Sequence, residues 1–195
     1  MRRLIFTFGF CVLCLAGIFN VSAKATTETS DIKVEEVEVV DGRIRIGELY
    51  TDLGVPSEDV YVTREVTDKE TVVSVFDKEN NEYLFGFTEE NTNPNVRGTY
   101  LKTVSQTKSS GGAQATLQMQ LECYSSSSFR QINKVVSTKW IANSGSFLTT
   151  EAKGYIVDKN SQGVGTKARM YGTVTMKKGS NSNIAITIDH TYSLY

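Results

Sequence analysis

The sequence has few residues of the kinds that build catalytic and metal sites. It contains one histidine and three cysteines in 195 residues. Zinc sites need several paired ligands, so this inventory argues against one. A nucleotide fingerprint is missing too, because Gly163-Val164-Gly165 lacks the third glycine and the following helix. We therefore expect no metal, no cofactor and no enzymatic activity.

The sequence also lacks an excess of either charge sign. Lys and Arg total 21 against 22 Asp and Glu, a formal net charge of −1, and 39% of positions are hydrophobic. Such a composition is typical of globular proteins and excludes a wholly disordered, collagen-like or polytopic membrane chain.

Export is indicated by the first 23 residues. Arg2 and Arg3 precede an uncharged stretch over 4–23, which ends in Val21-Ser22-Ala23 with small residues where signal peptidase needs them. We expect cleavage after Ala23 and secretion from a bacterial cell, with no transmembrane span left in the mature chain. An uncleaved anchor is the alternative, since about twenty apolar residues can just span a bilayer.

Cleavage would leave a single thiol, Cys123, so the mature protein could form no intramolecular disulfide. The remaining 172 residues are enough to form a stable hydrophobic core.

The second half of the chain alternates apolar and polar residues with a period of two, which predicts half-buried strands. Six strands are expected, at 99–107, 114–124, 129–141, 147–157, 166–177 and 183–194, separated by Gly, Asn and Ser turns. The predicted fold class is all-β, an antiparallel β-sandwich or alternatively a small β-barrel.

The first half is predicted to be a shorter, acidic, β-rich segment. A hairpin is expected over 31–46 around Asp41-Gly42, a helical turn over 48–53, and strands over 60–66 and 71–87, the latter folded at 78–81. The domain prediction is a signal peptide at 1–23, this acidic segment at 24–90, a linker at 91–96 and a basic β-sandwich domain at 97–195.

Charge is divided unequally between the two sides of this linker. Residues 24–96 hold 18 acids and 7 bases, a balance of −11, whereas residues 97–195 hold 4 acids and 12 bases, a balance of +8. The near neutrality of the whole chain conceals two oppositely charged halves.

One predicted strand of the basic half gathers cations on its outer face. With Ala168, Met170, Val174 and Met176 facing inward, the candidate anion-binding residues are Lys167, Arg169, Tyr171, Lys177 and Lys178. Possible partners are a cell-wall polymer or an anionic membrane surface. An ordinary solvated strand is the competing interpretation. Nucleic acid is a poor partner for an exported protein.

Other reactive side chains are expected to be structural. His190 is in phase with the apolar residues of the last strand and is predicted to be packed, Cys123 to be a buried hydrophobe, and Trp140 to lie in the core. The carboxylate pairs Glu35-Glu36, Glu58-Asp59 and Glu89-Glu90 are expected to be solvated, since adjacent strand residues face opposite ways.

These observations predict a secreted bacterial protein of the cell exterior that binds rather than catalyses. One alternative is polyanion binding by the basic domain, masked by the acidic segment. The other is a small barrel that holds an apolar ligand in its mouth.

Overall fold

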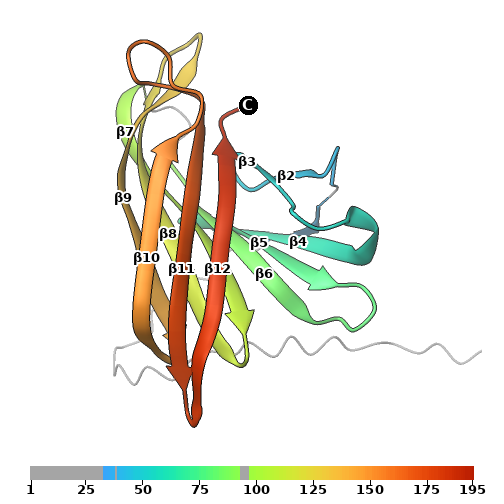
Figure 1. Cartoon of the computed structure of the whole chain (residues 1–195). Helices are drawn as coiled ribbons and strands as arrows, with labels where there is room; N and C mark the ends of the chain where they lie inside the picture. Colours follow the sequence, from blue (N-terminus) through green and yellow to red (C-terminus); the bar gives the residue numbers. More distant parts are fainter. Residues whose placement is uncertain (1–32, 38, 93–96) are drawn as a thin grey trace, which may run out of the picture.

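Two antiparallel β-sheets make up the protein in the computed structural model, which describes residues 33–37, 39–92 and 97–195 (Figure 1). The seven-stranded sheet has the order β1-β4-β5-β6-β7-β8-β9 and the five-stranded sheet the order β10-β11-β12-β3-β2. The prediction of an all-β sandwich is confirmed, and the described strands do not close into a barrel.

In the seven-stranded sheet the strands are β1 (Lys33–Glu36), β4 (Val60–Val66), β5 (Glu70–Asp77), β6 (Tyr83–Glu90), β7 (Gly98–Ser110), β8 (Ala113–Ser125) and β9 (Arg130–Ser144). In the five-stranded sheet they are β10 (Ser146–Ile156), β11 (Lys167–Lys178), β12 (Asn181–Ser193), β3 (Tyr50–Asp52) and β2 (Arg43–Arg45). A 3-10 turn, η1 (Ser57–Asp59), precedes β4. No helix in the described part of the chain is long and apolar enough to cross a membrane, and the predicted signal peptide lies outside that part.

The strands predicted in the second half are confirmed to within three residues at each end, and β4 matches its prediction at both ends. Between β7 and β8, Gly111 and Gly112 both have positive φ, at 51° and 77°. A two-residue hairpin turn of this kind follows the twist of its strands and favours glycine, so the turn fixes the register of the longest ladder.

Two predictions for the first half are wrong. Asp41-Gly42 does turn the chain, with φ of 51° and 70°, but only Val40 and Arg43 pair across it, and β1 pairs with β4 instead of β2. Residues 48–53 form no helical turn. Tyr50 and Thr51 have side chains that suit a strand, and they form β3 in a hairpin with β2.

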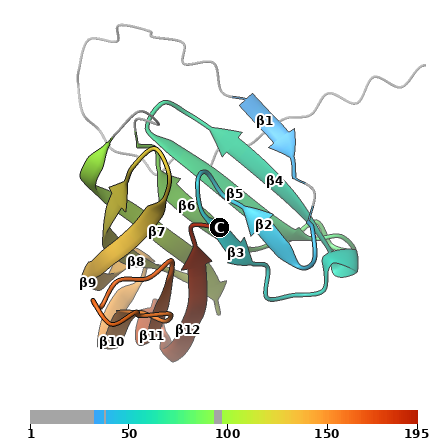
Figure 2. The same ribbon diagram turned by 90° about the horizontal axis from the view of Figure 1, so that it is seen from above.

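Both sheets contain strands from both sides of the predicted linker. Strand β6 pairs with β7 from Phe85 opposite Lys108 to Glu89 opposite Val104, and β12 pairs with β3 at Tyr192 and Thr51. Figure 2 shows β3 beside the end of β12, with β2 beyond it. The domain boundary stays a prediction, but residues 43–92 and 97–195 share one hydrophobic core.

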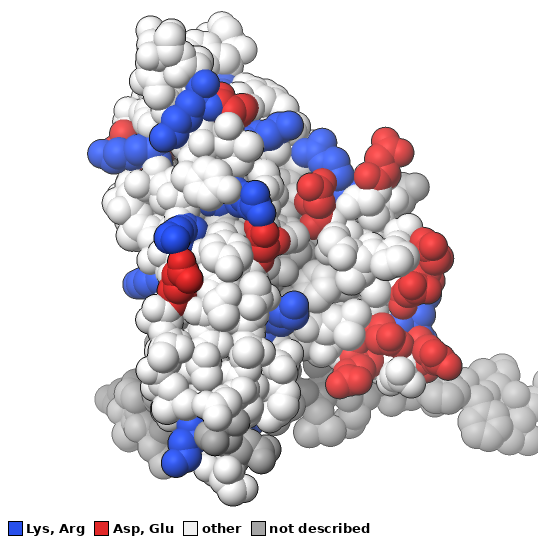
Figure 3. Space-filling view, in the orientation of Figure 1, with Lys and Arg blue, Asp and Glu red and all other residues white. Residues whose placement is uncertain are grey.

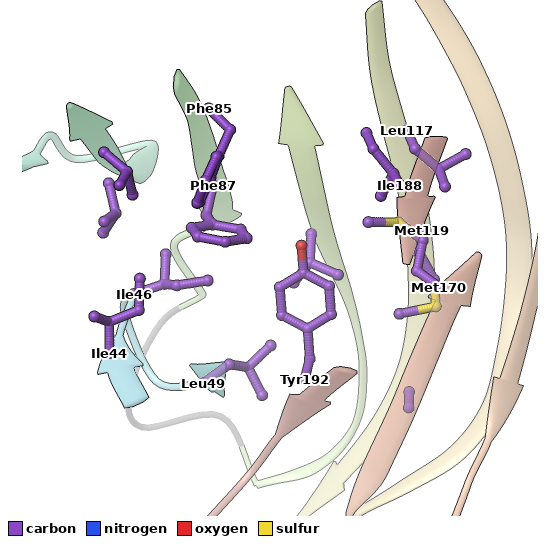
Figure 4. Close-up of a cluster of buried hydrophobic side chains, with 14 of the residues drawn as sticks. Ile44, Ile46, Leu49, Phe85, Phe87, Leu117, Met119, Met170, Ile188 and Tyr192 are labelled. Carbon is purple, nitrogen blue, oxygen red and sulfur yellow. The ribbon is translucent and has the colours of Figure 1, made fainter. Parts of the chain in front are cut away.

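That core lies between the sheets and is built from the inward residues of each strand. Figure 4 shows side chains of β2, β6, β8, β11 and β12 meeting there; the labelled ones include Ile44, Phe87, Met119, Met170 and Tyr192. Trp140 is also buried, as predicted, and its indole Nε1 donates to the carbonyl of Glu151 on β10 at 2.8 Å. This bond ties the edge strands β9 and β10 of the two sheets together.

Candidate functional site

The five candidate residues of β11 do not form one patch. Lys167, Arg169, Tyr171 and Lys177 lie on the face of β11 opposite to its buried residues, as predicted from the alternation. Lys167 and Lys177 stand at opposite ends of the strand, about 33 Å apart at about 3.3 Å per residue. The structure therefore separates Lys167 and Arg169 from Lys177 and Lys178.

Several of these cations already have partners. The Arg169 guanidinium donates from Nε and Nη2 to the two carboxylate oxygens of Asp189, at 2.6 and 2.5 Å, and this pairing lowers the pKa of Asp189. At the other end of β11, Lys178 Nζ donates to the carbonyl of Gly112. Beside Tyr171, Lys153 on β10 is paired with Glu151 at 2.7 Å. The charge of Arg169 is thus partly neutralised by Asp189 of the neighbouring strand β12, whereas Lys178 is hydrogen-bonded to the turn between β7 and β8 of the other sheet.

Sequence reasoning missed two arginines on the same face. The register of the five-stranded sheet continues from Lys167 on β11 through Ser193 and Tyr50 to Arg45 on β2. Both Arg43 and Arg45 lie over the Tyr50 ring, with guanidinium carbons 5.4 and 5.9 Å from its centroid. Two arginines of the acidic segment therefore join the cations of β11.

A hollow of about 220 Å³ lies among these side chains, lined by Arg43, Tyr50, Thr51, Asp52, Lys167, Thr191 and Ser193. Its one carboxylate, Asp52, is largely exposed and lies 3.8 Å from Arg43 Nε. We call Arg43, Arg45, Tyr50, Lys167 and Arg169 the basic end. Figure 3 shows blue side chains gathered over the upper part of β10–β12, while red ones dominate over β4–β6.

The signal for these arginines was in the sequence. Ile44 and Ile46 alternate with Arg43 and Arg45, so the pattern placed the arginines on an outer face. The pairing of β2 through β3 to β12 could not be inferred, because Tyr50 and Thr51 were assigned to a helical turn.

A second polar cluster lies inside the protein. Lys102 on β7 and Glu89 on β6 are 0% and 1% exposed, and Lys102 Nζ lies 2.6 Å from Glu89 Oε1. The same Nζ lies 2.9 Å from Oε2 of Glu48, a residue of the turn between β2 and β3. Arg130 Nη1 reaches Glu48 Oε2 at 3.9 Å from the other side.

Glu89 is also held by the backbone of the turn between β2 and β3. Oε2 accepts from the amides of Gly47 and Leu49 at 3.1 and 3.0 Å, and Oε1 accepts from the amide of Glu48 at 2.9 Å. Three successive N–H groups thus converge on one carboxylate, the arrangement by which backbone nests bind anions. The expectation that the pair Glu89-Glu90 is solvated is wrong for Glu89, which is in phase with the core residues Phe85 and Phe87.

A pocket of about 550 Å³ opens onto this cluster and is lined by Gly47, Glu48, Thr67, Asp68, Glu89, Asn91 and Thr92. Asn91 holds its rim, since its amide nitrogen donates to the Thr67 carbonyl at 2.6 Å and its oxygen accepts from Thr71 Oγ1 at 2.9 Å. Within the described residues, no group of His, Cys, Asp and Glu is arranged to hold a metal ion.

His190 and Cys123 are buried, as predicted. The His190 ring packs against Phe87, with ring centroids 4.6 Å apart, and burial lowers its pKa to about 4. Its Nε2 has no hydrogen-bond partner. Burial raises the pKa of the Cys123 thiol to about 12, which keeps it protonated and unreactive at neutral pH.

Comparison with known proteins adds no functional assignment: no family model, curated protein or solved structure matches this chain.

Proposed function

We propose that this is an exported bacterial protein that acts outside the cell by binding, and that its basic end binds an anionic polymer of the cell wall. The observation that carries the proposal is the row of Lys167, Tyr50 and Arg45 across the outer face of the five-stranded sheet. Guanidinium and ammonium groups beside an aromatic ring suit phosphate or carboxylate groups spaced along a chain.

The alternative in which the acidic segment masks the basic domain has less support. The segment itself contributes Arg43 and Arg45 to the basic end. Among the described residues, no carboxylate of that segment is ion-paired with Lys167, Arg169, Lys177 or Lys178. The acids that do cross to the other half, Glu48 and Glu89, are directed to Lys102 and Arg130 instead.

The apolar-ligand alternative depended on a barrel mouth. Because the described strands do not close into a barrel, that alternative loses the geometry on which it was based.

The test measures binding of the purified mature chain to inorganic polyphosphate at low and at physiological salt. The expected result is binding that weakens as salt rises, since each anionic contact releases counterions. A basic residue near an anionic surface contributes about 1 kcal/mol, so Arg45→Gln with Lys167→Gln should weaken binding about thirtyfold.

The matched control is Lys134→Gln with Lys139→Gln on β9, which removes the same charge from the other sheet and should leave binding nearly unchanged. The proposal would be contradicted if the two double variants lost the same affinity for polyphosphate, or if the wild type did not bind polyphosphate at low salt. A parallel arm with phosphatidylglycerol vesicles shows whether a membrane competes with the polymer.

A further inference from the structure

The buried cluster at Lys102 brings an amine into contact with two carboxylates in a site from which water is largely excluded. Lys102 Nζ is 2.6 Å from Glu89 Oε1 and 2.9 Å from Glu48 Oε2. Burying charges is costly even when they are paired. A reaction that converts an ammonium and a carboxylate into neutral groups would remove that cost.

The geometry suits attack of the amine on the Glu89 carboxyl carbon. Since a C–O bond is about 1.2 Å long, Nζ lies no more than about 3.8 Å from Cδ of Glu89. Reacting atoms in near-attack arrangements are about 3 to 3.5 Å apart, so only a small shift is needed. The two residues lie on neighbouring strands, with Glu89 opposite Val104, so the folded sheet holds them together.

The backbone around Glu89 has the form of an oxyanion hole. The amides of Gly47 and Leu49 both donate to Oε2, at 3.1 and 3.0 Å. Donors fixed in a dry site stabilise the negative charge that develops on a carboxyl oxygen during acyl transfer. Oε1, the oxygen nearer to Nζ, is then the one that leaves.

Glu48 is placed to carry protons between the two reacting groups. Its carboxylate Oε2 lies 2.9 Å from Lys102 Nζ, which in turn lies 2.6 Å from Glu89 Oε1, so the Glu48 carboxylate contacts the amine beside the oxygen that leaves. The side chain of Glu48 is 28% exposed, whereas that of Glu89 is 1% exposed. Both residues line the pocket of about 550 Å³, which gives the released water a way out.

We infer that Lys102 and Glu89 form an intramolecular isopeptide bond once the protein has folded. Glu48 takes a proton from the Lys102 ammonium and passes it to Glu89 Oε1, which gives an amine and a carboxylic acid. The nitrogen lone pair then attacks Cδ, and the charge on Oε2 is held by Gly47 and Leu49.

A second proton moves from nitrogen through Glu48 to Oε1, the Cδ–Oε1 bond breaks, and one water molecule leaves. The amide nitrogen keeps its last proton, Glu48 is again a carboxylate, and the positive and negative charges of the reactants have cancelled. The reaction needs no oxidant and no co-reactant.

The bond would cross-link β6 to β7 and so add a second covalent link, besides the backbone, between the two halves of the chain. A cross-link of this kind constrains the unfolded chain as a disulfide does. No disulfide has this role among the described residues, because Cys123 is the one cysteine there and it is free.

The test is mass spectrometry of the purified, folded mature chain and of its proteolytic peptides. The expected wild-type mass is lower than the sequence mass by one water molecule, and digestion should release one branched peptide that joins Glu89 to Lys102. Lys102→Arg and Glu48→Gln should both have the full mass, whereas the adjacent control Glu90→Gln should keep the loss.

Circular dichroism confirms that each variant is folded, and Glu48→Gln keeps the test valid if Lys102→Arg does not fold. A folded wild-type chain of full mass would overturn the inference, as would a branched peptide that joins Lys102 to Glu48. Loss of water in folded Glu48→Gln would refute the role of Glu48.

Discussion

Replacing His190 tests whether the buried ring limits the pH range in which the protein is stable. The side chain is 8% exposed, packs on Phe87 and Tyr192, and has an unpartnered Nε2. Burial lowers its pKa from 6.5 to about 4, against the weaker opposing effect of the carboxylates of Asp52 and Asp189. His190→Phe removes the titrating group and keeps a ring in the same apolar site.

The lowered pKa of His190 decides in which direction the stability of the protein changes with pH. The unfolded chain binds a proton at His190 below pH 6.5, whereas the folded chain does so only near pH 4, so stability is lost as the pH falls through this interval. The full difference corresponds to about 3 kcal/mol, and about 2 kcal/mol of it is lost by about pH 5.

The assay is urea unfolding of the wild type and of His190→Phe at pH 7.5 and at pH 5, followed by the fluorescence of the only tryptophan, Trp140. Carboxylates whose pKa is lowered by groups other than His190, such as Glu122 and Asp158, occur in both proteins and cancel in the comparison. From pH 7.5 to pH 5, the free energy of unfolding of the wild type should fall by about 2 kcal/mol more than that of His190→Phe. The reasoning would be refuted if the two proteins differed in free energy of unfolding by the same amount at both pH values. A histidine NMR titration centred near pH 6.5 would refute it as well.

Two further substitutions test the packing of the sheets. Gly154→Ala on β10 should destabilise the protein by about 1 to 3 kcal/mol in urea unfolding, because the added Cβ would collide with Thr138 and Val135 of β9; an unchanged midpoint would show that β10 does not pack on β9 as described. Asp189→Asn should cost less than about 1 kcal/mol despite the two hydrogen bonds to Arg169, because both side chains are 41% exposed and the pair is screened by solvent. A decrease of several kcal/mol in the free energy of unfolding would show that the Arg169–Asp189 pair is much less exposed to solvent than 41%.

Local alternation was sufficient to predict most of the strands. In β8, Leu117, Met119 and Leu121 are fully buried, while the residues between them are more exposed. The period of two carries this information without knowledge of the partner strand. It fails for β3, which has three residues, too few to show a period, and it does not reveal that β2 pairs with β3. Their pairing is decided by tertiary contacts that bring Thr51 next to Tyr192.

The candidate site was predicted only where it lies on a single strand. The outward orientation of Lys167 and Arg169 follows from the buried neighbours of β11, but Arg45 reaches the same face through two intervening strands. No local rule connects residues so far apart in sequence. The buried cluster was missed for a different reason. Alternation predicts that Glu89 and Glu90 face opposite ways, but it does not show that Glu89 is the buried one or that its partner is Lys102, 13 residues further along the chain.

The division of charge in the sequence acquires a different meaning in the folded chain. Glu48 and Glu89 of the acidic half meet Lys102 of the basic half inside the protein, at the site that holds the turn between β2 and β3 against β6. This contact fixes β2, and β2 presents Arg43 and Arg45 beside Lys167. The interior carboxylates therefore position the exterior arginines. A change that frees the turn, such as Glu89→Ala, should weaken anion binding at the basic end even though it removes a negative charge.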